Sequence, residues 1–245
     1  MDKIILYGLF GRTIVAVVRN PSTFDELKAV LPEIQCALQM NLSEAEALAY
    51  LASGKKVDAI LYEVDSPISS GLDFLSRVLA IDGSSAPVFF VSDKLDQQYY
   101  EAFFQGVEAI FFKPLEVEKV LKSIAFSLSM LTDQSMRQHP RRRLKRARIQ
   151  YSPSEGLPAN GYVADISAGG MFISSMSELP KEGDIIKYKL MYRADESIEI
   201  NGSAIVKWIR PGLELGRPPG FGVQFDNPSE RAKELILRLV AEGNI

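Results

Sequence analysis

The sequence predicts two domains: a doubly wound parallel α/β sheet, followed by a small antiparallel six-stranded β-barrel with a C-terminal helix. In the first half, short apolar segments alternate with amphipathic helical patterns, which indicates a parallel sheet with helices on both faces. After residue 140, short strand patterns separated by Gly and Pro replace the helical periodicity, as in a small barrel. A chain of 245 residues is long enough for both. We expect domains at residues 1–132 and 141–245, joined by a linker at 133–140.

The elements of the first domain follow from apolar runs and helix boundary signals. Strands are expected at residues 14–18, 57–62, 87–91 and 107–112. Ser43 and Glu46 form a capping box, in which each side chain satisfies a backbone N–H at the start of a helix. Helices are expected at residues 21–31, 43–54, 72–79, 97–104 and 115–136.

The second domain shows strand patterns and one closing helix. Clusters of Gly and Pro separate the strands, which favours an antiparallel barrel with short connections. The strands are expected at residues 147–151, 162–166, 170–174, 185–192, 198–209 and 222–225, and the helix at 228–242. For Trp208, in the fifth of these strands, we favour a place in the barrel core over a role as a stacking platform.

Composition and charge limit the possible functions. The hydrophobic fraction of 47% supports a buried core, and the net charge of only -3 argues against a nucleic-acid binder that acts through bulk charge. Cys36 is the only cysteine, so no internal disulfide can form. No segment is long and apolar enough to span a bilayer, and we expect a cytoplasmic protein. Because no metal-ligand cluster, P-loop or nucleophile motif is visible, we expect a non-enzymatic protein without metal or cofactor.

Polar residues follow the predicted strands of the first half at an informative spacing. Glu63 follows an apolar strand and precedes a proline and a glycine, Ser92 ends the next strand, and Lys113 comes directly after the last. Over residues 13–130 the chain resembles a response-regulator receiver domain. The resemblance implies that Glu63 stands at the phosphate-acceptor position, with Ser92 as the switch hydroxyl and Lys113 as the lysine of the site.

Two departures from the receiver pattern decide the chemistry we expect. Receivers hold Mg²⁺ with an acidic pair after the first strand, and Arg19 and Asn20 stand in those places here. Mg²⁺ prefers anionic oxygen ligands, so a cation at the site adds repulsion. The acceptor is Glu63 instead of aspartate, and we expect no phosphorylation by the usual route. Lys113 either forms an ion pair with Glu63 that imitates a permanently charged state, or both residues are relics on a loop face.

A receiver-like domain without this chemistry is expected to bind a partner. Apolar residues at helical spacing run from 115 to 131, and this helix either packs on its own sheet or extends to pair with a second copy. We therefore expect an unidentified protein partner or a homodimer.

Two motifs in the second half carry the strongest functional signal. Arg142 and Arg146 form the pattern R-x-x-x-R, and Asp165, Ser167 and Gly170 form D-x-S-x-x-G later in the chain. A segment G-F-G-V-Q-F follows at residues 220–225. Over residues 138–243 the chain resembles the PilZ family, the bacterial receptors for cyclic di-GMP. The resemblance implies that these five motif residues bind that ligand.

The motif residues suit a doubly charged guanine dinucleotide. A guanidinium grips phosphate oxygens with two hydrogen bonds and can also stack on a base. Asp165 can accept from the N–H groups of a guanine edge, and Ser167 can donate or accept nearby. Gly170 allows a close backbone approach or a positive φ. Arg143 and Gly169 are further candidates for the same site.

The resemblance also implies how the ligand acts. Arg141, just before the first motif arginine, favours two cyclic di-GMP molecules per site, and Arg148 replaces Arg146 if the loop shifts. We expect the ligand to order the basic interdomain segment and to change the domain arrangement or partner binding. The alternatives are a nucleic-acid-binding regulator that uses the basic run, against which the acidic remainder of the chain argues, and a ligand-free adaptor that binds protein.

Overall fold

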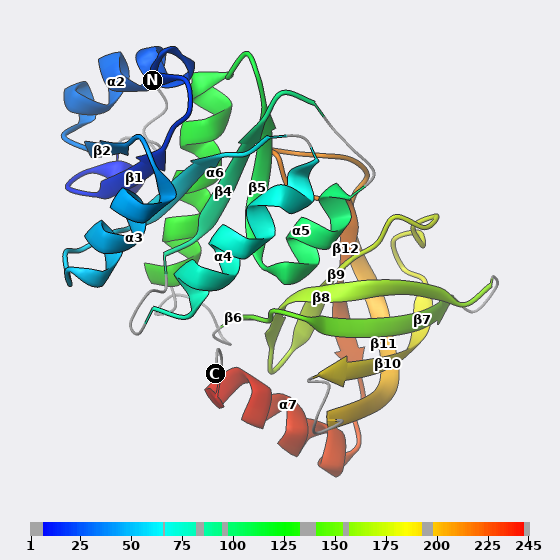
Figure 1. Ribbon diagram of the computed structural model, residues 1–245. Helices are drawn as coiled ribbons and strands as arrows, with labels where there is room; N and C mark the ends of the chain where they lie inside the picture. Colours follow the sequence, from blue (N-terminus) through cyan, green and yellow to red (C-terminus); the bar gives the residue numbers. More distant parts are fainter. Residues whose placement is uncertain are drawn as a thin grey trace. The chain divides into compact units, whose positions relative to one another are not determined.

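The chain forms two compact units (Figure 1). The first contains residues 1–132 and the segment Leu215–Arg217, and the second contains residues 133–214 and 218–245. The computed structural model describes residues 7–65, 67–81, 86–94, 98–132, 141–153, 157–192 and 198–242. The linker expected at 133–140 lies outside the described residues.

The first unit is built on a parallel sheet. Within the described residues it has five strands in the order β2-β1-β3-β4-β5. These are β1 (Thr13–Val17), β2 (Ala37–Asn41), β3 (Ala59–Glu63), β4 (Val88–Ser92) and β5 (Val107–Phe112). β3 and β4 are buried along their whole length, because helices cover both faces of the sheet. The doubly wound parallel sheet predicted from the sequence is confirmed.

Strand β2 is the strand of this sheet that the sequence did not predict. It lies at the edge of the sheet beside β1, and only Asn41 among its five residues is buried. An edge strand that is half exposed needs no continuous apolar run, so the segment ALQMN carried little strand signal.

The helices pack on the two faces of the sheet. Leu27 of α2 and Ile124 of α6 share one core with Leu61 of β3, whereas Tyr62 of β3 stacks on Phe74 of α4 across the opposite face, with ring centroids 4.4 Å apart. The helices are α2 (Asp25–Val30), α3 (Glu44–Ala52), α4 (Leu72–Leu79), α5 (Tyr99–Gln105) and α6 (Val117–Thr132). Short 3-10 turns are η1 (Pro21–Phe24), η2 (Leu31–Ile34) and η3 (Ile68–Gly71).

Helix α3 begins with the predicted capping box. The Ser43 side chain accepts from the Glu46 backbone N–H at 3.2 Å, and the Glu46 carboxylate accepts from the Leu42 backbone N–H at 2.9 Å. Ser43→Ala is expected to lower the free energy of unfolding of this unit by about 1 kcal/mol, because it leaves an N-terminal amide of the helix without its cap. Urea unfolding followed by far-UV circular dichroism measures this loss. Ser76→Ala, at an exposed position inside α4, should cause no loss.

Three residues from late in the chain belong to the first unit. The Gly216 carbonyl accepts from the Ile110 N–H at 2.9 Å, and the Arg217 guanidinium pairs with Glu108 at 2.7 Å. Arg217 also donates to the Ser127 hydroxyl at 2.6 Å. Gly216 has a φ of +76°, and a Cβ there would lie 2.7 Å from the Ile110 carbonyl oxygen, so this position requires glycine.

The second unit is an antiparallel barrel. Six strands in the order β8-β7-β10-β11-β12-β9 close on themselves through pairing of β8 with β9, as far as the described residues go. They are β7 (Ala147–Pro153), β8 (Ala159–Ser167), β9 (Gly170–Ser174), β10 (Ile185–Tyr192), β11 (Ile198–Arg210) and β12 (Gly220–Asp226). A further two-residue strand, β6 (Arg142–Arg143), pairs with β8. The predicted six-stranded barrel is confirmed.

Helix α7 (Glu230–Glu242) completes the second unit. It buries Ala232, Ile236 and Leu239 in the same core as the inward-facing residues of the barrel. The predicted C-terminal helix is therefore confirmed. Among the described residues, no helix of either unit combines the length and the apolar character that crossing a membrane requires.

Candidate functional site

The D-x-S-x-x-G motif forms a tight hairpin. Ser167 ends β8, Gly170 begins β9, the two residues pair, and the Ser167 hydroxyl donates to the Gly170 carbonyl at 3.1 Å. A Cβ on Gly170 would lie 2.0 Å from the Val223 carbonyl oxygen. Of the two roles that the sequence left open for Gly170, close backbone approach is therefore the one in the structure. The Gly169 carbonyl accepts from the Phe225 N–H at 3.0 Å, which ties the turn to β12.

The basic segment lies against this hairpin. Arg142 pairs with Ile166 and Arg143 with Asp165 in the β6–β8 ladder. The Arg141 guanidinium reaches the Asp165 carboxylate at 3.2 Å. The start of the first motif and the acid of the second are thus brought together by strand pairing.

Arg142 and Arg143 point to opposite faces of the short strand β6. Directly opposed residues of an antiparallel pair share a face. Arg143 therefore shares the outer face with Asp165, whereas Arg142 shares the face of Ile166, which lies in the barrel core. The Arg142 guanidinium donates to the carbonyls of Val240 and Ala241 at the end of α7, at 3.2 Å each.

Arg146 and Arg148 follow at the beginning of β7. Arg146 is exposed and has a φ of 57°, a left-handed conformation that is uncommon for a side-chain-bearing residue. Arg148 is exposed on β7, opposite Tyr162 of β8. Which of the two is the second motif arginine in the bound state stays a prediction. Between the motif arginines, burial and then the charge of Arg143 lower the pKa of Lys145.

One row of side chains crosses five strands on the outer face of the barrel. The ladder registers place Arg143 opposite Asp165, Asp165 opposite Phe172, Phe172 opposite Gly222, and Gly222 opposite Trp208. Basic, acidic and aromatic groups therefore follow one another along a single line that contains the motif aspartate.

A β-bulge near each end turns the row outward. Strand alternation from Val163 and from Val206, both buried, would direct Asp165 and Trp208 into the barrel. The register shifts between Val163 and Asp165 and again between Val206 and Trp208, so both side chains face out instead. The assignment of Trp208 to the core is therefore wrong, and the residue is 39% exposed.

The aromatic part of the row is a stacked pair. The Phe172 and Trp208 rings lie 4.9 Å apart at 20°, and the Arg210 guanidinium carbon lies 4.3 Å from the Phe172 ring centroid. A Cβ on Gly222 would lie 2.1 Å from the Trp208 Nε1, so glycine makes room for the indole. The sequence did not predict this pair, although Gly222, which makes room for the indole, belongs to the G-F-G segment that the motif includes. An exposed indole, with a guanidinium on the ring stacked beneath it and a carboxylate further along the same row, can receive a flat, anionic heterocycle.

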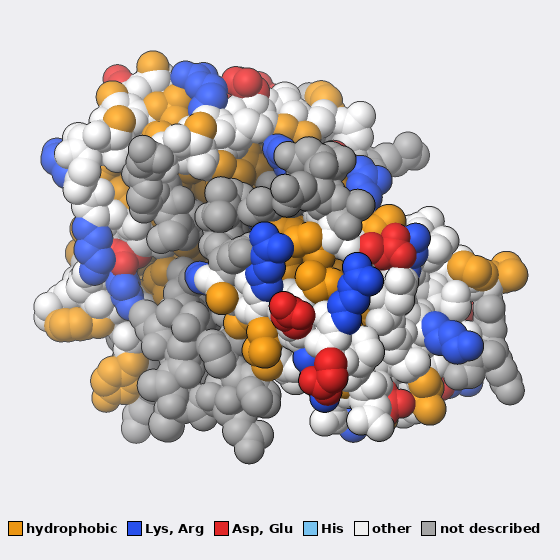
Figure 2. Space-filling model, turned by 90° about the horizontal axis from the view of Figure 1, so that it is seen from below, with side chains coloured by type: hydrophobic (Ala, Val, Ile, Leu, Met, Phe, Trp, Pro, Cys, Tyr) orange, Lys and Arg blue, Asp and Glu red, His pale blue; other side chains and the backbone are white. Residues whose placement is uncertain are grey.

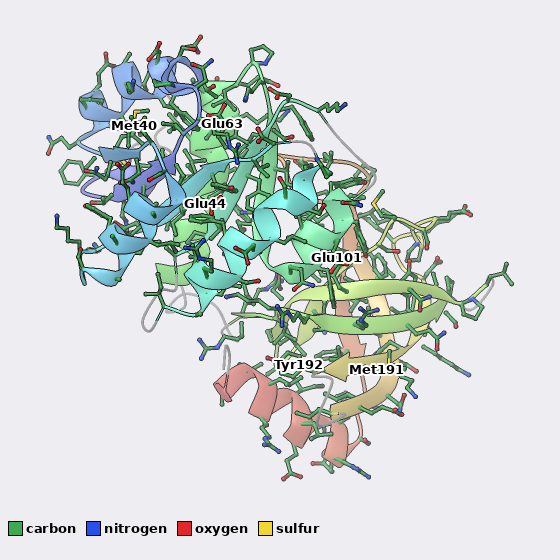
Figure 3. All side chains as sticks on the ribbon, viewed as in Figure 1. Met40, Glu44, Glu63, Glu101, Met191 and Tyr192 are labelled. Carbon is green, nitrogen blue, oxygen red and sulfur yellow. The ribbon has the colours of Figure 1, made fainter. Side chains whose placement is uncertain are left out.

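The residues that the sequence places at receiver-like positions lie at the carboxyl ends of the parallel strands. Glu63, labelled in Figure 3 at the end of β3, is buried. Its carboxylate accepts from the backbone N–H groups of Arg19 at 2.7 Å and Asn20 at 3.0 Å, and from the Thr23 hydroxyl at 3.0 Å. The Lys113 ammonium lies 2.6 Å from the same carboxylate. Of the two alternatives for Lys113, the ion pair is therefore the one that the structure contains.

The ion pair has opposite effects on its two members. Burial alone would raise the pKa of Glu63, but the hydrogen bonds from Lys113, Asn20, Arg19 and Thr23 outweigh it and lower that pKa. Burial would lower the pKa of Lys113, but bonds to Glu63 and Asp93 outweigh it and raise that pKa. Both groups are held in their charged forms.

The remaining positions do not fit the magnesium ion of a receiver. The Arg19 guanidinium pairs with Asp65, and the buried Ser92 hydroxyl donates to the Lys94 carbonyl at 3.2 Å. No group of three or more His, Cys, Asp or Glu side chains within the described residues has a geometry that could hold a metal ion. The Lys113 ammonium is paired with the Glu63 carboxylate.

Comparison with known proteins assigns the second half to a family. The family model of the PilZ domain matches residues 135–242, so this part of the chain is a PilZ domain. No curated protein matches the chain.

Some solved structures are similar to one half or the other of this chain. The PilZ domain of Escherichia coli YcgR with c-di-GMP is 16% identical with a TM-score of 0.37, over 44% of this chain and 91% of that one. The Bacillus subtilis inhibitor of motility MotI/DgrA is 19% identical with a TM-score of 0.36, over 44% of this chain; the chain covers 51% of the length of that protein. A receiver domain of a Pseudomonas aeruginosa sensor histidine kinase is 18% identical with a TM-score of 0.40, over 47% of this chain and 98% of that one.

Proposed function

We propose that the protein is a non-enzymatic receptor for cyclic di-GMP, which binds on the outer face of the barrel beside the Asp165 hairpin. The observation that carries this proposal is the pairing of β6 with β8, which puts Arg141 and Arg143 beside Asp165. Together with the PilZ match over residues 135–242, this arrangement supports a binding role for the motif residues.

The roles follow from the chemistry of the ligand. A guanine edge donates two N–H bonds to Asp165, which releases Arg141 from its ion pair to bind phosphate. Ser167 and the Gly169–Gly170 backbone line the same turn, and Arg143 adds charge on this face. Trp208, exposed in the same cross-strand row, offers its ring to a base. Two stacked ligand molecules would satisfy Arg141 and Arg146 together.

The basic segment is the proposed moving part. Residues 141–146 contain a two-residue strand and an exposed left-handed arginine, and to close over a ligand the segment must give up its short ladder with β8. Ligand binding would order this segment and change the domain arrangement or partner binding, in an order–disorder switch.

Titration calorimetry of the full chain tests the proposal. Cyclic di-GMP should bind, and GTP should bind far more weakly because it lacks the second guanine. Arg146→Ala is expected to weaken cyclic di-GMP binding about tenfold, through loss of one charge-assisted contact. Equal binding of both nucleotides would contradict the proposal, and one ligand per chain would remove the stacked pair.

Nucleic acid is the competing ligand of the basic segment. On the face shown in Figure 2, Lys and Arg side chains are interspersed with Asp and Glu instead of forming one field. A nucleic-acid binder depends on dense positive charge and loses affinity steeply with salt. A gel shift with unrelated duplexes in moderate salt, if positive, would favour this alternative over the cyclic di-GMP receptor.

For the first unit we infer a role in binding protein, without phosphorylation. The Glu63–Lys113 pair supports this, because the acceptor carboxylate already holds a cation. The partner is an unidentified protein or a second copy of the chain. Incubation with acetyl phosphate and Mg²⁺ should leave the mass of the protein unchanged.

A further inference from the structure

We propose that Arg142 is a switch residue between the ligand site and helix α7: without ligand its guanidinium holds the C-terminal end of α7, and cyclic di-GMP withdraws it. This inference rests on the proposed function and adds a regulation of the same site.

The contact to α7 is a two-point cap. Arg142 donates from Nε to the Val240 carbonyl and from Nη2 to the Ala241 carbonyl, at 3.2 Å each. The last carbonyls of a helix have no partner within the helix, and they carry the negative end of its dipole. A guanidinium that reaches two consecutive carbonyls therefore stabilises the final turn by hydrogen bonding and by charge.

Arg142 cannot hold α7 and serve the outer face at once. Its partner in the ladder is the core residue Ile166, whereas Asp165 and Arg143 lie on the opposite face. Contact with a ligand held at Asp165 requires the backbone at Arg142 to leave its pairing with Ile166 and rotate. β6 has only two residues, and Leu144 after it donates to the Ala164 carbonyl and lies in the barrel core, so the movement can be confined to Arg141 and Arg142.

The consequence for α7 is confined to its end. Ile236 and Leu239 are each 1% exposed and fix the helix to the barrel, whereas Ala241 beyond them is exposed. Loss of the Arg142 cap therefore frays the final turn without releasing the whole helix. Because coupling between two sites is reciprocal, freeing the end of α7 by other means must tighten ligand binding.

Hydrogen exchange on the full chain, with and without saturating cyclic di-GMP, tests the withdrawal of the cap. The ligand is expected to speed amide exchange at residues 239–242 by at least about tenfold, because the two hydrogen bonds from the Arg142 guanidinium are lost. Arg142→Ala should produce the same acceleration without ligand. Arg231→Ala, which removes an exposed arginine from the first turn of the same helix, should not.

A second variant tests the reciprocal effect. Ala241→Pro unwinds the last turn, because proline lacks the N–H and clashes with the preceding turn, and its exposed side chain leaves the core intact. This variant is expected to bind cyclic di-GMP up to about tenfold more tightly than wild type, since Arg142 is already free. Ala241→Ser keeps the helix and should bind as wild type does.

The outcomes separate the two proposals. A protein that binds cyclic di-GMP while exchange at residues 239–242 stays unchanged overturns the switch and leaves the receptor standing. Unchanged affinity in Ala241→Pro, with its last turn shown to be frayed, also overturns the switch. A protein that does not bind cyclic di-GMP overturns both.

Discussion

Asp165→Ala is expected to weaken binding of cyclic di-GMP by about 100-fold, the effect of losing two hydrogen bonds to a charged group at about 1.5 kcal/mol each. The carboxylate faces outward only because a β-bulge follows Val163, and its side chain is 14% exposed. A guanine edge that meets it is shielded from water, which keeps these bonds strong. Titration calorimetry with wild type and variant measures the change.

The ion pair that Asp165 makes without ligand does not offset this loss. Arg141 is 37% exposed in that pair, and a pair so accessible to solvent contributes at most about 1 kcal/mol. Without the ion pair, the free-energy cost of releasing Arg141 to the ligand is lower. This gain is smaller than the free energy lost with the two guanine hydrogen bonds. Glu182→Ala, an exposed carboxylate of the same unit, should leave the affinity unchanged. Wild-type affinity in Asp165→Ala would exclude Asp165 from the ligand site.

The strands and helices were largely predictable because burial imposes periodicity on the sequence. β3 and β4 are buried on both faces and therefore have continuous apolar sequences. The barrel strands are separated from one another by clusters of Gly and Pro. The edge strand β2 carried no such run. A β-bulge that turns a side chain outward also leaves no signal in the sequence. By strand alternation Val206 and Trp208 would both face inward, but the register shift between them moves the indole to the surface.

The candidate site was predictable only where the motif named the residue. The two motifs identified Arg142 and Asp165, and strand pairing brings their segments together. The present partners of Arg142 are backbone carbonyls at Val240 and Ala241, which carry no sequence signal of their own. The sequence also left two options for Glu63 and Lys113, an ion pair or two relics on a loop face. The distance between the two side chains depends on where β3 and β5 end, which residue types alone do not determine.

Lys113→Met is expected to lower the free energy of unfolding of the first unit by about 3 kcal/mol at neutral pH, because it leaves Glu63 as a buried charge without its counterion. Glu63 keeps its bonds to the Arg19 and Asn20 backbone and to Thr23, which limits the loss. Hydrogen exchange of the β3 and β5 amides measures this unit by itself, and Trp208 fluorescence during urea unfolding follows the barrel, which should be unaffected. The double variant Glu63→Gln, Lys113→Met should regain most of the loss, since it removes both charges.

The loss caused by Lys113→Met should depend on pH with a defined sign. In wild type the pKa of Glu63 lies below its ordinary value of 4.5, so its stabilising contribution is complete above that pH and declines as the pH falls through the folded-state pKa. Lys113→Met removes the hydrogen bond from the Lys113 ammonium, which lowers the pKa of Glu63, whereas burial still raises that pKa. Glu63 in the folded variant therefore takes up its proton at a higher pH than in wild type. The difference in stability between wild type and variant must therefore shrink as the pH falls below about 4.5. A difference that stays constant from pH 7 to pH 3, or a double variant as unstable as Lys113→Met, would mean that the ion pair does not hold the site together.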